Sequence, residues 1–95
     1  MNQPLVTVVC SCFNHQNFLE DALYSVLQQT YPNVQIIVID DASTDNSWEV
    51  MKLISSKNND VKSIRLSRNF GQHPAIMAGL SEAKGEWIVV MWLTY

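Results

Sequence analysis

The sequence predicts a three-layer α/β/α protein in which a mostly parallel sheet lies between helices. Apolar, β-branched segments of strand length alternate with segments that have the apolar periodicity of helices. Most of the strand-like segments are apolar throughout, as strands buried on both faces of a sheet are. Successive strand–helix–strand steps require right-handed crossovers, which place helices on both faces. With 95 residues, the chain is too short for more than one small domain.

The first half of the chain contains one strand–helix–strand unit. Residues 5–12 (LVTVVCSC) form an apolar run that is too short for a helix, so we expect a buried strand. Over residues 17–29, apolar side chains beginning with Phe18 recur at the spacing of one helical face. A turn at Pro32 ends this helix, and residues 34–40 (VQIIVID) are predicted to form a second buried strand.

A second helix and a more exposed strand follow. The helix is expected to begin near Asn46, which is spaced from Glu49 as in a capping box. The polar residues 55–60 break its apolar pattern and are expected to end it. Residues 61–67 alternate only loosely between apolar and polar, which is typical of a strand at the edge of a sheet.

The last two elements complete the alternation. Pro74 suits the first turn of a helix that ends near Ala83, with Met77 among the residues of its apolar face. Residues 86–93 (EWIVVMWL) are predicted to form a fourth strand. In such doubly wound sheets, ligands bind beyond the carboxyl ends of the strands. The loops that follow the strands are therefore the places to look for function.

Composition and charge exclude several classes of protein. The net charge is −3, and no run of Lys or Arg provides the stripe that duplex nucleic acid requires, so we expect no nucleic-acid partner. The apolar run 87–93 is far shorter than the roughly 20 residues that span a bilayer. No signal peptide is evident, so we expect a cytoplasmic location. Cys10 and Cys12 are then reduced, and we expect both to be small buried side chains.

Acidic residues follow the second predicted strand. Asp40 and Asp41 end it, and Asp45 comes shortly after them. Carboxylates there can accept hydrogen bonds from a base N–H or a ribose hydroxyl, or help to hold a hard cation, but they repel phosphate unless a metal intervenes. The favoured ligand is therefore the nucleoside end of a nucleotide. The alternative is structural, with Asp45 or Ser43 capping the next helix and Asp40 tying down the loop. Because Asp40 and Asp41 are adjacent, we expect one of them to point into the cleft.

The loops after the first and third strands supply further candidates, namely Phe13, Asn14, His15, Arg68, Asn69 and Gly71. A ring such as that of Phe13 can stack on a flat base. Arg68 has a planar set of donors that suits a diphosphate, and Asn69, Gly71 and the start of the next helix offer further donors. In the structural alternatives, Arg68 pairs with a surface carboxylate and His15 is solvated or structural.

Four motifs, in this order and spacing, resemble the amino-terminal half of a family 2 glycosyltransferase of the GT-A fold. They are F-N after the first strand, Q-T-Y-P-N before the second, D-D-A-S-T-D after it and R-N-F-G after the third. The last region is most similar to the branch of dolichol-phosphate mannosyltransferases and bactoprenol glucosyltransferases. The resemblance covers nearly the whole chain. It implies a Rossmann-like sheet of strand order 3-2-1-4, with residues 1–95 as the nucleotide-sugar-binding half.

The resemblance also implies an activity and a set of binding residues. The activity is transfer of a sugar from a UDP- or GDP-linked donor, with Mg or Mn bridging the diphosphate. The implied nucleotide-binding residues are Ser11, Phe13, Asn14, Asp40, Asp41 and Asp45, of which Asp41 would bond to the base. The residues implied near the diphosphate or sugar are Arg68, Asn69 and Gly71. Burial of Asp41 against the chain's own amides would overturn this donor site.

The chain departs from the family pattern after the fourth strand. The family has Asp, a small residue and Asp there, which hold the metal, whereas this chain reads Trp92, Leu93, Thr94 and Tyr95. The part that carries the acceptor site and general base is also expected to be missing. We therefore expect no bound metal, no catalytic residue and no turnover in this truncated chain, with weak nucleotide affinity retained. If the parent acts on a polyprenyl phosphate, its location would be the inner face of the membrane.

The fourth strand leads us to expect a homodimer. With the rest of the family's sheet missing, this strand would be an uncovered apolar edge, and such edges pair with other chains. Trp87 and Trp92 could also pack across a two-fold axis. An alternative function is a non-catalytic nucleotide-binding or assembly module of the same fold. A phospho-receiver domain is disfavoured because its acidic pair would follow the first strand, where none is found.

Overall fold

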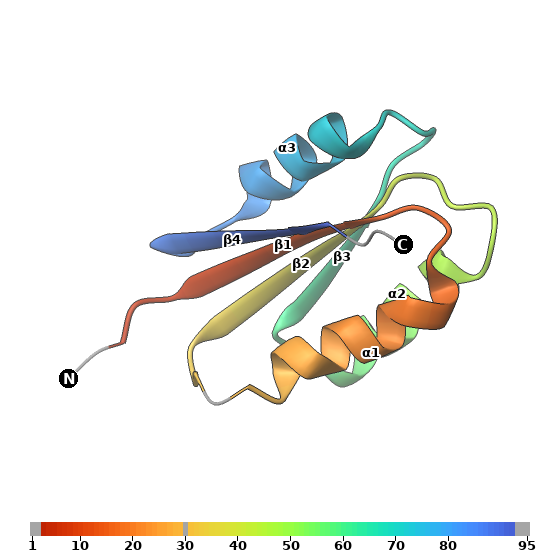
Figure 1. Cartoon of the computed structure of the whole chain (residues 1–95). Coiled ribbons are helices and arrows are strands. Elements are labelled where there is room, and N and C mark those ends of the chain that lie inside the picture. Colours follow the sequence, from red (N-terminus) through yellow and green to blue (C-terminus); the bar gives the residue numbers. More distant parts are fainter. Residues whose placement is uncertain (1–2, 30, 93–95) are drawn as a thin grey trace.

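The computed structural model describes residues 3–29 and 31–92, in which strands and helices alternate (Figure 1). In chain order the elements are β1 (Val6–Cys12), α1 (Gln16–Leu27), β2 (Val34–Asp40), α2 (Ser47–Lys57), β3 (Val61–Arg65), α3 (Gln72–Glu82) and β4 (Trp87–Trp92). Each predicted element is present, and its ends differ from the prediction by a few residues at most. The predicted end of the last strand, Leu93, lies outside the described residues.

The four strands form one parallel sheet in the order β3-β2-β1-β4, which confirms the predicted topology. In register, Val6 of β1 lies opposite Val34 of β2 on one side and Trp87 of β4 on the other. β3 is an edge strand, as its looser pattern predicted. Figure 1 shows α1 and α2 on one face of the sheet and α3 on the other, which gives the three predicted layers.

The central strands bury side chains on both faces, because successive residues of a strand point to opposite sides. On the face under α1 and α2, Cys10 and Cys12 of β1 pack with Leu19 and Leu23 of α1. On the opposite face, Val9 packs in the cluster that contains Ala75 and Ile76 of α3. Both cysteines are therefore buried on the same side of the first strand, as predicted.

Two expectations about helix α2 are wrong. The capping box is not formed, because the Asn46 side chain makes no capping hydrogen bond. The helix also continues through the polar segment that was expected to end it. Ser55 and Ser56 lie within its last turns, and their hydroxyls donate to the carbonyls of Met51 and Leu53. Serine side chains can bond to the preceding turn in this way, so a polar segment need not end a helix.

Two residues assigned to apolar helix faces point to solvent instead. Phe18 of α1 is 55% exposed and Met77 of α3 is 64% exposed. α3 packs on the sheet through Ala75 and Ile76, and Gly79 is buried in the same face. The small residues allow the helix to approach the sheet closely, and this places Met77 on the outer side.

Strand β4 is apolar but poorly covered. Trp87, Ile88, Val89 and Val90 are 66%, 46%, 48% and 38% exposed. α3 packs on β1 and β2. An apolar groove of about 250 Å³ borders Val89 on the face that carries α1. Among the described residues, no helix has the length and apolar character needed to cross a bilayer.

Candidate functional site

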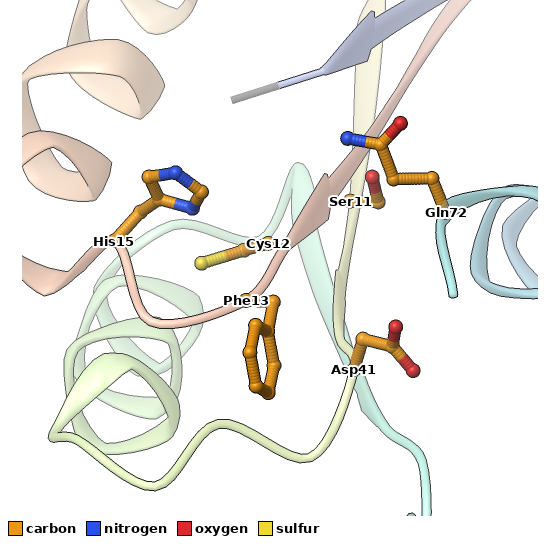
Figure 2. Close-up of a pocket in the computed structure, with 6 residues that line it drawn as sticks. All are labelled: Ser11, Cys12, Phe13, His15, Asp41 and Gln72. Carbon is orange, nitrogen blue, oxygen red and sulfur yellow. The ribbon is translucent and has the colours of Figure 1, made fainter. Parts of the chain in front are cut away.

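The loops that follow β1 and β2 and the start of α3 meet around a small pocket at the carboxyl ends of the strands. Figure 2 shows the residues that line it, which are Ser11, Cys12, Phe13, His15, Asp41 and Gln72. The pocket has a volume of about 30 Å³, enough for about two water molecules. A nucleobase is far larger, so one could enter only if some of these side chains moved.

The structure brings four of the candidate residues together at this pocket, namely Ser11, Phe13, His15 and Asp41. Phe13 is 39% exposed, which leaves its ring accessible to a ligand. Sequence analysis missed Cys12 and Gln72. Only their positions could have indicated them, because Cys12 ends a strand and Gln72 begins a helix. Burial raises the pKa of the Cys12 thiol, which keeps it neutral.

Asn14 connects two loops by hydrogen bonds. Its backbone adopts a φ of 56°, a left-handed conformation that asparagine tolerates better than most residues. Its side-chain oxygen accepts hydrogen bonds from the amides of Thr44 at 2.8 Å and Asp45 at 3.3 Å. Its own amide donates to the hydroxyl of Ser43 at 2.9 Å. The loop after β1 is thus fixed to the loop after β2 by both the backbone and the side chain of Asn14.

Asp45 strengthens this tie from the other loop. One carboxylate oxygen accepts the amide of Ser47 at 2.9 Å, and the other accepts the amide of Gln16 at 3.2 Å. Burial acts to raise the pKa of Asp45, but the hydrogen bonds from Ser47 and Gln16 outweigh it and hold the pKa below its usual value. The carboxylate therefore holds the starts of α1 and α2 together, which matches the structural alternative considered for this residue.

Asp40 lies beneath its loop and does not line the pocket. Its side chain is fully buried, and one oxygen accepts the amide of Ser43 at 3.1 Å. The other oxygen lies 3.5 Å from Nε of Arg65. These contacts tie the loop down, as the structural alternative proposed, and they pair a buried charge with a half-exposed one.

Asp41 lines the pocket, but its carboxylate is already bonded to the chain. One oxygen accepts the amide of Phe70 at 2.8 Å and the other accepts the amide of Gly71 at 2.9 Å. The residue is only 3% exposed. Asp41 therefore lies at the cleft, as expected for one of the two adjacent aspartates, but the loop after β3 occupies its carboxylate. This is the burial against the chain's own amides that was expected to overturn the donor site, so Asp41 gives no support for it.

The residues predicted to lie near a diphosphate form that loop after β3. The guanidinium of Arg68 lies 4.8 Å from the centre of the Phe70 ring, within the range of a cation–π contact. The Asn69 side chain accepts the amide of Gly71 at 3.1 Å. Gly71 has a φ of 97°, which favours glycine, and it caps the start of α3. Arg68, Asn69 and Gly71 thus lie together at the amino end of α3.

Comparison with known proteins gives a family match over most of the chain. The model of the family described as Glycosyl transferase family 2 matches residues 7–91. An uncharacterized glycosyltransferase of Haemophilus influenzae is 35% identical over 91 residues, which cover 96% of this chain and 36% of the relative. An undecaprenyl-phosphate 4-deoxy-4-formamido-L-arabinose transferase of Yersinia pestis is 34% identical over an alignment of 100 residues, gaps included, which covers 96% of this chain and 30% of the relative.

A solved structure matches the fold over nearly the whole chain. The mannosyltransferase PcManGT from Pyrobaculum calidifontis, in complex with GDP-Man and Mn²⁺, superposes with a TM-score of 0.88 and 25% sequence identity. The superposition covers 97% of this chain and 28% of that chain. This chain spans about a third of the length of the curated relatives that it matches.

Proposed function

Because the chain belongs to glycosyl transferase family 2, we propose that residues 1–95 are the amino-terminal, nucleotide-sugar-binding part of a glycosyltransferase domain. The activity of the whole domain is transfer of a sugar from a nucleoside-diphosphate sugar to an acceptor. The family match over residues 7–91 is the observation that carries this proposal. The donor class is supported by the superposed mannosyltransferase, whose structure contains GDP-Man.

The pocket at the carboxyl ends of β1 and β2 is the proposed position of the nucleoside. Phe13 offers an accessible ring for stacking on the base, and Ser11 lines the same pocket (Figure 2). Gln72, which is exposed at the start of α3, is the flexible side chain whose movement would widen the pocket.

Arg68 and the amides at the start of α3 supply positive charge and donors for the diphosphate. Asn14 and Asp45 contribute by fixing the loops that carry these groups.

The residues present do not fit the metal ion that the family implies. The superposed mannosyltransferase is bound with Mn²⁺. In residues 3–29 and 31–92, no group of three or more His, Cys, Asp and Glu residues could hold a metal ion. Residues 92–95, which stand where the resemblance places two carboxylates, contain none. Nucleotide binding by these 95 residues is therefore proposed to be independent of metal.

The proposal also includes a location at a membrane and assembly as a homodimer. The Yersinia relative is named as an undecaprenyl-phosphate transferase, which supports action on a polyprenyl phosphate, and on that basis we propose the inner face of the membrane as the location. The exposed apolar residues of β4 support a homodimer in which this edge strand pairs with a second copy.

Calorimetric titration tests the proposed function. UDP, GDP and their sugar conjugates are each titrated into the 95-residue chain, with and without Mn²⁺, and release of sugar is measured in parallel. We expect weak binding of at least one nucleotide, no effect of Mn²⁺ and no turnover. Absence of binding by every nucleotide would overturn the proposal.

The same titration addresses a second candidate function, a non-catalytic nucleotide-binding module. The lack of a metal-ligand cluster in the described residues favours this alternative. Tight binding that is independent of metal, together with no transfer when the remaining part of a relative's domain is supplied as a second polypeptide, would favour the module.

A further inference from the structure

Two loops beside the pocket are joined by a set of hydrogen bonds, which we call the loop clamp. It joins residues 14–16, after β1, to residues 43–47, after β2. We propose that the loop clamp holds the Phe13 ring in position for stacking on a base, and that Gln16 and Ser47 are positioning residues within it. This inference rests on the proposed function, because it takes the base to lie against Phe13. The family resemblance assigned no role to Gln16 or Ser47.

Gln16 and Ser47 join the first turns of two helices. The amide of Gln16 donates to a carboxylate oxygen of Asp45 at 3.2 Å, and its side-chain oxygen accepts the amide of Asn46 at 2.8 Å. Ser47 is fully buried, and its hydroxyl accepts the amide of His15 at 3.2 Å. α1 begins at Gln16 and α2 at Ser47, and both helices bury side chains against the sheet. The clamp is therefore attached to two elements that cannot shift without disturbing a close-packed core.

The backbone of both loops has a conformation that needs support. Asn14, which directly follows Phe13, has a φ of 56°, and Ala42, in the loop after β2, has a φ of 59°. Left-handed backbone is unfavourable for alanine, because its β-carbon approaches the following carbonyl oxygen. The amide of Asn14 donates to the hydroxyl of Ser43 at 2.9 Å, and its side-chain oxygen accepts the amide of Thr44 at 2.8 Å. The clamp thus stabilises a backbone conformation that short segments seldom keep on their own.

The position of the Phe13 ring depends on this backbone. The ring is 39% exposed, so packing holds only part of it. The chain on either side is fixed by Cys12, which is buried in β1, and by Asn14 in the clamp. A ring that is already oriented loses less conformational entropy when a base stacks on it, so the base binds more tightly. Gln16 and Ser47 thus contribute to affinity without touching the nucleotide.

Two substitutions weaken the clamp from opposite sides. Gln16→Ala removes the oxygen that accepts the Asn46 amide, and alanine is compatible with the first turn of a helix. Ser47→Ala removes the hydroxyl that accepts the His15 amide. We expect each to weaken binding of UDP or GDP by about threefold, which corresponds to the contribution of one hydrogen bond. Binding of inorganic diphosphate should not change, because neither substitution removes a bond of the loop that carries Arg68.

NMR shift changes measure the binding, and two variants serve as controls. Gln28→Ala makes the same change of side chain at the other end of α1. Ile54→Val removes a buried methyl group near the far end of α2, so it lowers stability and leaves the clamp intact. Both controls should bind UDP and GDP like the wild type. Equal weakening by Ile54→Val and Gln16→Ala would mean that stability alone sets the affinity. Equal weakening of nucleotide and diphosphate binding would mean that the clamp does not act through Phe13, and either result would overturn the inference.

Measurements on the ligand-free chain separate this inference from the proposed function. We expect the Asn46 amide to lose protection against hydrogen exchange in Gln16→Ala, and the His15 amide in Ser47→Ala, while the sheet amides keep theirs. The backbone order parameter of Phe13, from NMR relaxation, should fall in both variants. An unchanged order parameter would refute the positioning role whatever the chain binds. If the order parameter falls but the wild type binds no nucleotide, the clamp holds Phe13 as inferred and the proposed function fails.

Discussion

At the scale of single residues, Asp40, Asp41 and Asp45 share one kind of chemistry, in which each accepts hydrogen bonds from backbone amides of the loops around the pocket. A carboxylate has several lone pairs and no donor, so it can satisfy amides that loops leave without partners. The same property suits a carboxylate to a ligand's N–H groups. Substitutions at these positions must therefore be judged by stability as well as by binding.

The buried carboxylate of Asp40 leads to a prediction about its partner, Arg65. Arg65→Met keeps an unbranched apolar side chain but removes the charge 3.5 Å from Asp40, together with the guanidinium that lies 5.7 Å from the centre of the Trp48 ring. We expect it to lower the free energy of unfolding by about 1–3 kcal/mol, less than for a fully buried pair because the Arg65 side chain is 48% exposed. Urea denaturation measures the change.

Lys62→Met is the matched control, because Lys62 lies on the same strand and pairs with exposed Glu82. Its cost should be below about 1 kcal/mol, since exposed ion pairs contribute little. Equal costs for Arg65→Met and Lys62→Met would show that the Asp40 carboxylate does not depend on Arg65.

The buried thiol of Cys10 leads us to predict a loss of stability at high pH. Burial, with a smaller contribution from Cys12, raises the pKa of Cys10 from 9.0 to about 12. Below pH 9.0 the thiol is protonated in both the folded and the unfolded chain, so the stability that its burial provides is fully present. As the pH rises toward 12, the unfolded chain releases this proton while the folded chain keeps it, so the free energy of unfolding falls.

Cys10→Ala removes this titration and leaves the other groups in place. We expect the unfolding midpoint in urea to fall less steeply between about pH 8 and about pH 10.5 in Cys10→Ala than in the wild type. The comparison uses the slopes, because the smaller side chain also lowers stability at every pH. Parallel slopes would mean that Cys10 titrates normally in the folded chain.

At the scale of the elements, the close approach of α3 to the sheet depends on Gly79. A β-carbon at this position would lie 2.5 Å from atoms of Val9 and Ile39, which are both buried in the sheet. Gly79→Ala should therefore destabilise the fold by about 1–2 kcal/mol, although alanine favours helices by about 1 kcal/mol over glycine. Thermal unfolding measures the change.

Ser81→Ala on the exposed side of the same helix provides the comparison. It should change stability by less than about 0.5 kcal/mol. A stabilising effect of Gly79→Ala would show that α3 can move away from the sheet at little cost.

The elements and their order were predictable, whereas the partners of the loop side chains were not. A continuous apolar run such as residues 34–40 predicts a buried strand from adjacent residues alone. The partners of Asp41 lie 29 and 30 residues away in the chain, and nothing in the local pattern encodes them. For the same reason, the meeting of Ser11, Phe13 and Asp41 followed from the fold, but the presence of Gln72 did not.

At the scale of the whole molecule, the sheet has two unlike edges. β3 is short and carries the charged residues Lys62 and Arg65, which discourage pairing with another sheet. β4 carries apolar side chains on both faces, and Trp87 is 66% exposed. Pairing with a second copy would satisfy the backbone of β4 and cover part of this apolar surface. The proposed homodimer should therefore depend on β4 alone.

Val90→Lys tests this dependence. In a two-fold pairing of β4, the lysines of both copies would lie at one interface, where like charges repel. We expect the dissociation constant of the dimer, measured by sedimentation equilibrium, to rise by about tenfold or more. Leu53→Lys, at a position on α2 that is 55% exposed, introduces the same charge away from β4 and should leave the constant unchanged. A monomeric wild type at high concentration would refute the dimer, and equal effects of the two lysines would place the interface elsewhere.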